Sequence, residues 1–245
     1  MTALLEAREL HKAYGGLQAV QRCSFEVAPG TITALIGPNG AGKTTAFDII
    51  NGVIAADSGT VIFEGRDVTG FMPHQLTRLG VSRTFQITRD LGEMTVLENM
   101  VVSSPAAGLR SLLGSKILKR ERDRAMELLD FVGISALATT AAKKLSYGQK
   151  KLLEFASVLM SEPKLVLLDE PAGGVNPALL ERITDRIRRL NESGITFFIV
   201  EHNMDVVMQL SDWVIVMAHG EVLVDGPPAA IQEDETVLDA YLGRA

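Results

Sequence analysis

The sequence is short of cysteine and aromatic residues, and it has no apolar run long enough to cross a membrane. Cys23 is the single cysteine among 245 residues, which excludes an internal disulfide and a multi-cysteine zinc site. We expect Cys23 to be a small packing residue. The longest unbroken apolar run is Trp213–Ala218, far below the roughly 20 residues that span a bilayer. Charged residues at positions 6, 8 and 9 interrupt the segment where a secretory signal would be apolar, which predicts a cytoplasmic protein.

An excess of positive charge is also missing. The chain has 24 Lys and Arg against 30 Asp and Glu, so its formal net charge is −6 and its sequence pI is near 5.3. This balance argues against a protein that is held to nucleic acid by charge. Hydrophobic residues make up 47% of the chain, which excludes a mainly disordered protein. At this length we expect one compact unit with a large core.

Apolar patterns divide the chain into a β-rich start, a helical middle and an alternating end. Short strand patterns occupy residues 3–10, 19–27, 31–36 and 60–63, between Gly and Pro turns, and some of them should pair antiparallel. The middle opens with Thr95 and Glu98 at capping-box spacing. Residues 116–132 then repeat apolar side chains at helical spacing, beside charged residues that favour a solvated face.

The last third of the chain alternates between buried strands and helices. Apolar runs at 165–168, 196–200 and 213–217 are separated by helical patterns at 177–190 and 204–210. Such alternation is typical of an α/β fold with a mainly parallel sheet.

A phosphate-binding loop is the most informative segment. Residues 37–44 read GPNGAGKT directly after an apolar run, which matches the pattern G-x-x-x-x-G-K-[ST]. Glycines let backbone N–H groups face a phosphate chain, and the following helix N-terminus adds its dipole. We expect Lys43 to contact the β and γ phosphates and Thr44 to offer a hydroxyl to Mg²⁺. The alternative is a Gly-rich turn between a strand and a helix.

Two adjacent carboxylates, Asp169 and Glu170, end the apolar run that begins at residue 165. Ligands of parallel α/β sheets bind beyond the carboxyl ends of the strands, so this pair is suitably placed for chemistry. Asp169 is expected to hold Mg²⁺ through water, and Glu170 to orient or deprotonate an attacking water. A helix N-cap pair is the alternative explanation.

The order of the motifs points to a family. Ser146 and Gln149 alone indicate only a capping box. Between the phosphate loop and the acid pair, however, LSYGQ at residues 145–149 resembles the signature motif of ABC-type ATPases, usually written L-S-G-G-Q. Tyr14, Gln86 and His202 match that family's adenine-stacking aromatic, Q-loop and switch histidine. Taken singly they would be explained by turn packing, a solvated strand end and a structural histidine.

The resemblance covers about residues 5–226 and implies an α/β fold. A P-loop NTPase core with a mainly parallel sheet should carry an antiparallel β subdomain and an inserted helical subdomain. We expect a single domain over residues 1–245. Its nucleotide-binding core and β subdomain should occupy 1–89 and 155–227, its helical subdomain with the signature 90–154, and a tail 228–245.

The resemblance also assigns site residues, with ATP and Mg²⁺ as cofactors. The expected catalytic residues are Glu170, His202, Lys43 and Gln86. The expected metal ligands are Thr44, Gln86 and Asp169. The expected nucleotide contacts are Tyr14, Asn39, Gly40, Ala41, Gly42, Lys43, Thr44, Thr45, Ser146, Gly148 and Gln149.

Partners follow from the same resemblance. In ABC-type ATPases the signature contacts the nucleotide held by the opposite subunit, and this chain has one signature and one phosphate loop. It should therefore act as a homodimer or heterodimer with a second ATPase subunit. Transmembrane permease subunits should dock on the helical insert, roughly residues 90–144, and a solute-binding protein should act indirectly. This places the protein on the inner face of the cell membrane, with no nucleic acid partner.

Two positions depart from the common family pattern. Tyr147 stands where a Gly is usual, and Asn176 where many members have Asp, although Asn176 still suits a helix N-cap before Pro177. The LSYGQ spelling and the segments at 94–99 and 172–177 resemble the ATP-binding subunit of branched-chain amino acid uptake systems. Related urea or polar-solute importers, lipid exporters and ABC ATPases outside transport remain alternatives. A kinase or GTPase explains neither the signature nor His202.

Overall fold

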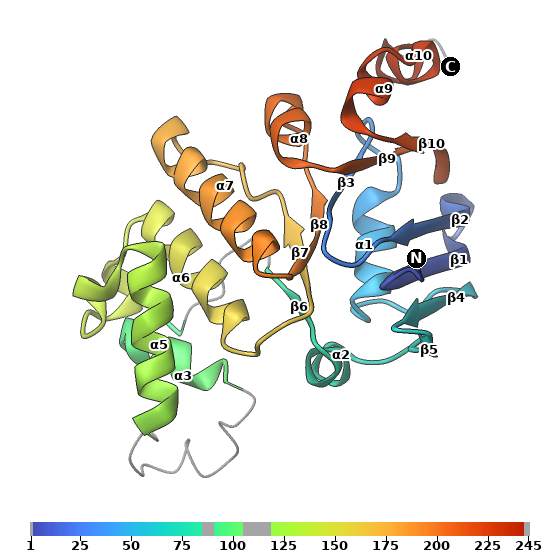
Figure 1. The fold of residues 1–245 in the computed structure, drawn as a ribbon. Helices are drawn as coiled ribbons and strands as arrows, with labels where there is room; N and C mark the ends of the chain where they lie inside the picture. Colours follow the sequence, from blue (N-terminus) through green and yellow to red (C-terminus); the bar gives the residue numbers. More distant parts are fainter. Residues whose placement is uncertain (1, 85–90, 105–118, 243–245) are drawn as a thin grey trace.

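A computed structural model of the protein describes residues 2–84, 91–104 and 119–242, and it confirms the predicted α/β architecture (Figure 1). A six-stranded sheet forms the centre, in the order β10-β9-β3-β8-β7-β6. All neighbours in it are parallel except the pair β9 and β10. Its strands are β3 (Ile32–Ile36), β6 (Val81–Arg83), β7 (Leu165–Asp169), β8 (Thr196–Val200), β9 (Trp213–Ala218) and β10 (Glu221–Gly226).

A separate antiparallel sheet has the order β2-β1-β4-β5, which confirms the predicted antiparallel pairing. Its strands are β1 (Leu5–Tyr14), β2 (Leu17–Val27), β4 (Ser58–Phe63) and β5 (Arg66–Asp67). β1 continues past the predicted end at residue 10, because its register shifts let it pair with β2 as far as Tyr14 and Leu17. Helix α1 (Lys43–Ile50) lies between this sheet and the central one (Figure 1).

Both faces of the central sheet are buried, as the continuous apolar runs predicted. Successive residues of a strand point to opposite faces, and the two packing clusters follow this rule. Leu167 and Phe198 belong to the cluster shared with α1 and the antiparallel sheet, whereas Leu168 and Phe197 belong to the cluster shared with the helical layer. The Phe198 ring contacts those of Phe25 and Phe47, with centroid distances of 5.4 and 5.6 Å.

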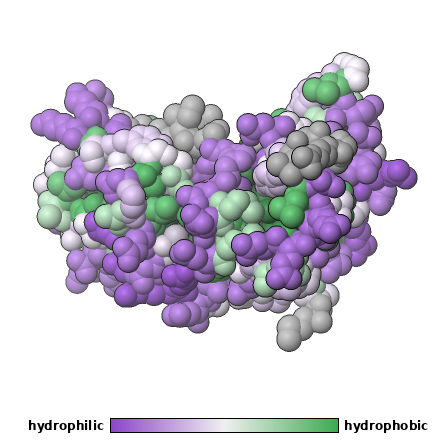
Figure 2. Space-filling model, turned by 90° about the horizontal axis from the view of Figure 1, so that it is seen from above, coloured by the Kyte–Doolittle hydropathy of each residue, from purple (hydrophilic) through white to green (hydrophobic). Residues whose placement is uncertain are grey.

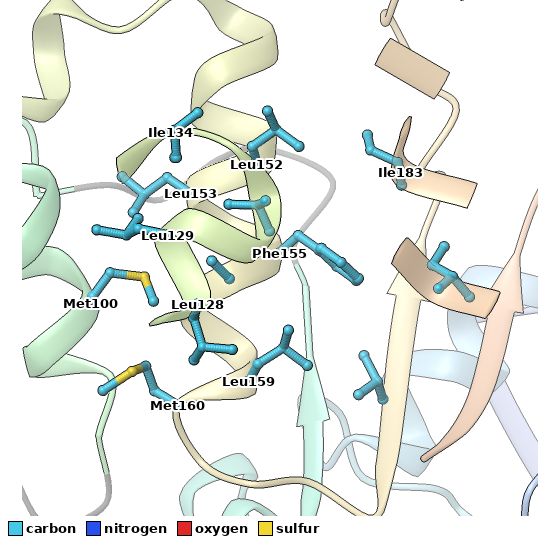
Figure 3. Close-up of a cluster of buried hydrophobic side chains, with 14 of the residues drawn as sticks. Met100, Leu128, Leu129, Ile134, Leu152, Leu153, Phe155, Leu159, Met160 and Ile183 are labelled. Carbon is cyan, nitrogen blue, oxygen red and sulfur yellow. The ribbon is translucent and has the colours of Figure 1, made fainter. Parts of the chain in front are cut away.

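The predicted helical insert forms its own group of helices. α3 (Val96–Val102), α5 (Lys119–Val132) and α6 (Tyr147–Leu159) pack together, and two short 3₁₀ turns lie at Ser135–Leu137 and Ala142–Lys144. Figure 3 shows Leu128 and Leu129 of α5 facing α6, and Phe155 of α6 pointing toward Ile183. The predicted capping box of Thr95 and Glu98 is present. α6 is continuous across positions 154 and 155, the predicted boundary between the helical subdomain and the core.

The remaining helices lie along the central sheet and at its end. α7 (Pro177–Glu192) and α8 (Met204–Leu210) follow β7 and β8, close to the predicted ranges, and α10 (Glu235–Leu242) lies in the predicted tail. Several elements were not predicted, among them α2 (Pro73–Leu79), α9 (Pro228–Gln232), the short strands β5 and β6, and the edge strand β10. β10 alternates exposed and partly buried residues, so it lacks the apolar run of the buried strands.

No helix within the described ranges is both long enough and apolar enough to span a membrane. On the face seen in Figure 2, the hydrophobic areas are separated by hydrophilic residues.

Cys23 is fully buried in β2, which confirms its predicted packing role. Burial raises the pKa of its thiol from 9.0 to about 12, so the reactive thiolate is scarce at neutral pH. We expect the native chain to resist an aromatic disulfide reagent at pH 8 and to react at its single thiol once urea unfolds it. The absorbance of the released thiolate measures both rates. Equal rates for the native and unfolded chain would contradict the buried position.

Candidate functional site

The phosphate loop connects β3 to α1, as predicted, and its backbone needs glycine at two positions. Gly37 has φ of 147° and Gly42 has φ of 96°, conformations that disfavour side chains. A Cβ atom on Gly37 would lie 2.0 Å from the Met217 carbonyl oxygen, and one on Gly42 would lie 2.2 Å from that of Ala19. Other residues cannot take these two places without moving the backbone.

Lys43 is buried within this loop and holds its shape. Its ammonium donates to the carbonyl oxygens of Gly37 and Pro38 at 2.8 and 2.9 Å. An ammonium has three N–H donors, so a further donor can face a phosphate oxygen. Burial lowers the pKa of Lys43, and the neighbouring Glu170 carboxylate partly opposes that shift. Lys43 and Glu170, far apart in sequence, therefore lie within electrostatic reach of each other.

Anion-binding groups gather where α1 begins. Gly42 is the N-cap and has no side chain to accept from the helix N–H groups, so those donors remain available to an anion. Asn39 and Gly40 are exposed, Ala41 is buried, and the predicted contacts Thr44 and Thr45 open the helix. The segment therefore has the geometry of a phosphate cradle.

Glu170 leaves the carboxyl end of β7 and meets His202, which follows β8. Glu170 Oε1 lies 2.8 Å from His202 Nε2. Glu170 has φ of 47°, a left-handed conformation that costs free energy and is concentrated at functional sites. Its N–H donates to the Val200 carbonyl at 2.9 Å, which ties the two strand ends together. The structure thus brings together two residues that the sequence proposed separately.

Arg83 is a site residue that the sequence analysis missed. Its guanidinium donates to Asp169 Oδ2 at 2.8 Å and also bonds Asp48 of α1. The guanidinium carbon lies 4.7 Å from the centre of the Phe47 ring. The side chains of Arg83 and Asp169 are only 7% and 6% exposed, so the pair is buried. The signal was weak because Arg83 belongs to β6, a strand of three residues.

Glu201 is a second missed residue, next to the predicted histidine. It is 3% exposed, and its carboxylate accepts three backbone N–H groups. Oε1 accepts from Ala172 at 2.6 Å, and Oε2 accepts from His202 and Asn203 at 2.9 and 3.0 Å. Glu201 therefore fixes the loops that follow β7 and β8 relative to each other. An acid beside the histidine was visible in the sequence, but its backbone partners were not.

The signature segment forms the start of α6. Ser146 is the N-cap, and its hydroxyl oxygen accepts from the Gln149 N–H at 3.3 Å, while the Gln149 side chain accepts from the Ser146 N–H at 2.9 Å. This confirms the capping box. Ser146 is exposed and Gly148 partly buried, and the Ser146 hydroxyl can still donate its own proton. Asn176 is the N-cap of α7, and its side chain accepts from the Leu179 N–H, as predicted.

Two further predicted residues are Tyr14 and Gln86. Tyr14 ends β1 and is 50% exposed, with the Lys12 ammonium 5.6 Å from the centre of its ring. A ring with this exposure is available for stacking. Gln86 lies outside the described residues.

The site has a donor set that fits Mg²⁺. Thr44 offers an exposed hydroxyl, and Asp48 lies four residues further along the same helix face. Arg83 bridges Asp48 and Asp169, so the Asp169 carboxylate lies beside that face of α1. A hydroxyl and carboxylates are the oxygen ligands that this hard cation prefers. Within the described part of the chain, no group of three His, Cys, Asp or Glu side chains forms a ready-made metal cage.

Comparisons with known proteins show what the chain is similar to. A family model described as ABC transporter matches residues 20–173, and one described as branched-chain amino acid ATP-binding cassette transporter matches residues 221–245. A probable branched-chain amino acid transport ATP-binding protein of Archaeoglobus fulgidus is 40% identical over 245 residues, covering 98% of this chain and 95% of the relative. The Escherichia coli K12 high-affinity branched-chain amino acid transport ATP-binding protein LivG is 38% identical, covering 99% and 98%.

A solved structure agrees with these sequence matches. An ATP-binding cassette of an ABC transporter in its ADP conformation superposes with a TM-score of 0.88 at 36% identity, covering 99% of this chain and all of the other. The similarity therefore extends over nearly the whole chain, including the helical insert.

Proposed function

This chain belongs to the family of ABC transporter ATP-binding proteins, and from that membership we propose that it hydrolyses ATP to drive the uptake of branched-chain amino acids. The single observation that carries the chemistry is the contact of Glu170 Oε1 with His202 Nε2 at 2.8 Å, beside a phosphate loop. The solute class rests on the relatives' names and on the match of residues 221–245 to a branched-chain cassette model.

Binding of ATP is the first step that the residues support. The backbone from Asn39 to Thr45 faces the phosphates, and Lys43 places its charge against the β and γ groups. Tyr14, which is exposed, stacks on the adenine. Thr44, Gln86 and Asp169 would hold Mg²⁺, which would supply positive charge against the phosphate oxygens.

Hydrolysis follows from the position of Glu170. Its carboxylate orients an attacking water in line with the γ phosphate and accepts a proton from it. His202 holds that carboxylate in place and stabilises charge that develops on the γ phosphate. Glu201 supports His202 by accepting its backbone N–H.

Complete sites need two chains. We infer that Ser146, Gly148 and Gln149 contact the ATP held by a second ATPase subunit, which makes the active form a dimer. The Ser146 hydroxyl is exposed and able to donate to a phosphate. Permease subunits would dock on the helical subdomain, on the inner face of the membrane, and receive the motion of closing and reopening.

Uptake of leucine in cells that lack the chain tests this proposal. We expect uptake of radiolabelled leucine to fall to background and to return when the wild-type chain is supplied. Ser146→Arg should not restore uptake, because a large cation would occupy the place of the partner's phosphates. Lys164→Met is the matched control, since Lys164 is exposed and its ammonium pairs with the exposed carboxylate of Glu64. Unchanged leucine uptake without the chain would contradict the solute class, and full restoration by Ser146→Arg would contradict the composite site.

A further inference from the structure

The loop that follows β7 is held by the signature helix of the same chain. Tyr147 donates its hydroxyl hydrogen to the Gly173 carbonyl oxygen at 3.2 Å, and Lys151 donates to the Glu170 carbonyl oxygen at 3.3 Å. These two acceptors are the first and last residues of the segment from Glu170 to Gly173. Both ends of that segment are therefore bonded to α6.

Tyr147 and Lys151 act as one unit. They are four residues apart on α6 and so share a face, and the Lys151 ammonium lies 5.9 Å from the centre of the Tyr147 ring. Lys151 is only 8% exposed. Gly174 packs directly on this ring, because a Cβ atom there would lie 3.1 Å from Tyr147 Cε1. Tyr147, which stands where the family usually has glycine, thus makes a specific packing contact with Gly174.

The bonded segment sets the orientation of Glu170. Its carbonyl oxygen accepts from Lys151 and also from the Gly173 N–H at 2.9 Å. Because Glu170 has a left-handed backbone with φ of 47°, it needs surrounding contacts to keep that conformation. Glu201 supplies another by accepting from Ala172 within the same segment. The backbone from which the Glu170 carboxylate projects toward His202 is thereby fixed from two sides.

We propose that Tyr147 and Lys151 are positioning residues that link the signature of one chain to Glu170 of that same chain. Ser146 directly precedes Tyr147, so a shift of Ser146 on contact with the partner's ATP would move the α6 face that holds Glu170. The signature would then orient the chain's own carboxylate as well as contact the partner's nucleotide. This inference rests on the proposed function.

Steady-state ATP hydrolysis by the assembled transporter tests the link. For Lys151→Met we expect kcat to fall about tenfold with little change in KM, since a charge-assisted bond that orients the reacting group is lost. Tyr147→Phe keeps the ring and removes only the hydroxyl, so a fall of about threefold in kcat is expected. Lys151→Arg should recover most of the kcat lost in Lys151→Met. Direct nucleotide-binding calorimetry should give unchanged ATP affinity for all three variants.

Lys164→Met serves again as the control. Lys164 lies just before the first residue of β7, whereas Glu170 lies just after the last. Wild-type kcat in both Lys151→Met and Tyr147→Phe would overturn the inference alone. A loss that Lys151→Arg does not repair, or that comes with a matching loss of ATP affinity, would indicate a structural role and overturn it too. Absence of ATP hydrolysis in the wild-type transporter would overturn the proposed function and this inference together.

Discussion

Glu170→Gln is expected to lower ATP turnover of the assembled transporter by about 10²- to 10⁴-fold, the usual contribution of a general base. The amide keeps the size of the side chain and cannot accept a proton from water. ATP binding should remain, because the phosphate loop and Lys43 are unchanged. Release of inorganic phosphate at saturating ATP and Mg²⁺ measures the effect. The control is Glu192→Gln, an exposed acid at the end of α7.

The same variant reports on the dimer. Because hydrolysis no longer reopens the closed state, light scattering of purified Glu170→Gln with ATP and Mg²⁺ should give twice the mass of the chain. A single-chain mass with ATP bound, as shown by calorimetry, would mean that a different ATPase chain or the permease completes the site. Undiminished turnover would contradict the proposed base, and failure to bind ATP would contradict the phosphate loop itself.

Arg83→Met is expected to destabilise the chain by about 3–5 kcal/mol, the usual cost of leaving a buried charge without its partner. Arg83 holds two carboxylates, and the Asp169 side chain is only 6% exposed. Methionine retains much of the contact with Phe47 but offers no donor. Urea unfolding of the nucleotide-free chain, followed by circular dichroism, measures the change in free energy.

Two further variants make this result specific. Lys164→Met removes an exposed ion pair and should change the free energy of unfolding by less than about 1 kcal/mol. Adding Asp169→Asn to Arg83→Met removes the orphaned charge and should recover part of the loss. If Arg83→Met unfolds at the same urea concentration as the control, the buried pair of Arg83 and Asp169 does not add to the free energy of unfolding and the prediction is wrong.

The sequence predicted those parts of the site that are contiguous in the chain. The phosphate loop, the acid pair and the capping box at Ser146 are each defined within a few residues, so pattern and spacing were sufficient. Contacts that depend on strand order were not predictable. Arg83 reaches Asp169 only because β6 is the neighbour of β7, and the Glu201 carboxylate reaches Ala172 only because β8 lies on the other side of β7.

The same distinction explains the fold. Buried strands such as Thr196–Val200 were predicted to the residue, because an unbroken apolar run carries its own signal. The edge strand β10 and the short strand β6 obtain their structure from a neighbour rather than from their own pattern. Tyr147 illustrates the limit for a side chain: the sequence identified it as a departure, and only the fold placed its hydroxyl on Gly173.

The strand order of the central sheet also sets the distance between the phosphate loop and Glu170. The phosphate loop follows β3 and Glu170 follows β7, with β8 and its His202 between them. Neighbouring strands lie about 4.8 Å apart, so β3 and β7, which flank β8, are separated by about 10 Å. Such a separation leaves room for the phosphates between the cradle and the carboxylate, with the histidine alongside. The hydrogen-bonded sheet, rather than the loops, therefore fixes the spacing between the phosphate loop and Glu170. Changes in loop length should alter this spacing less than a change in strand order would.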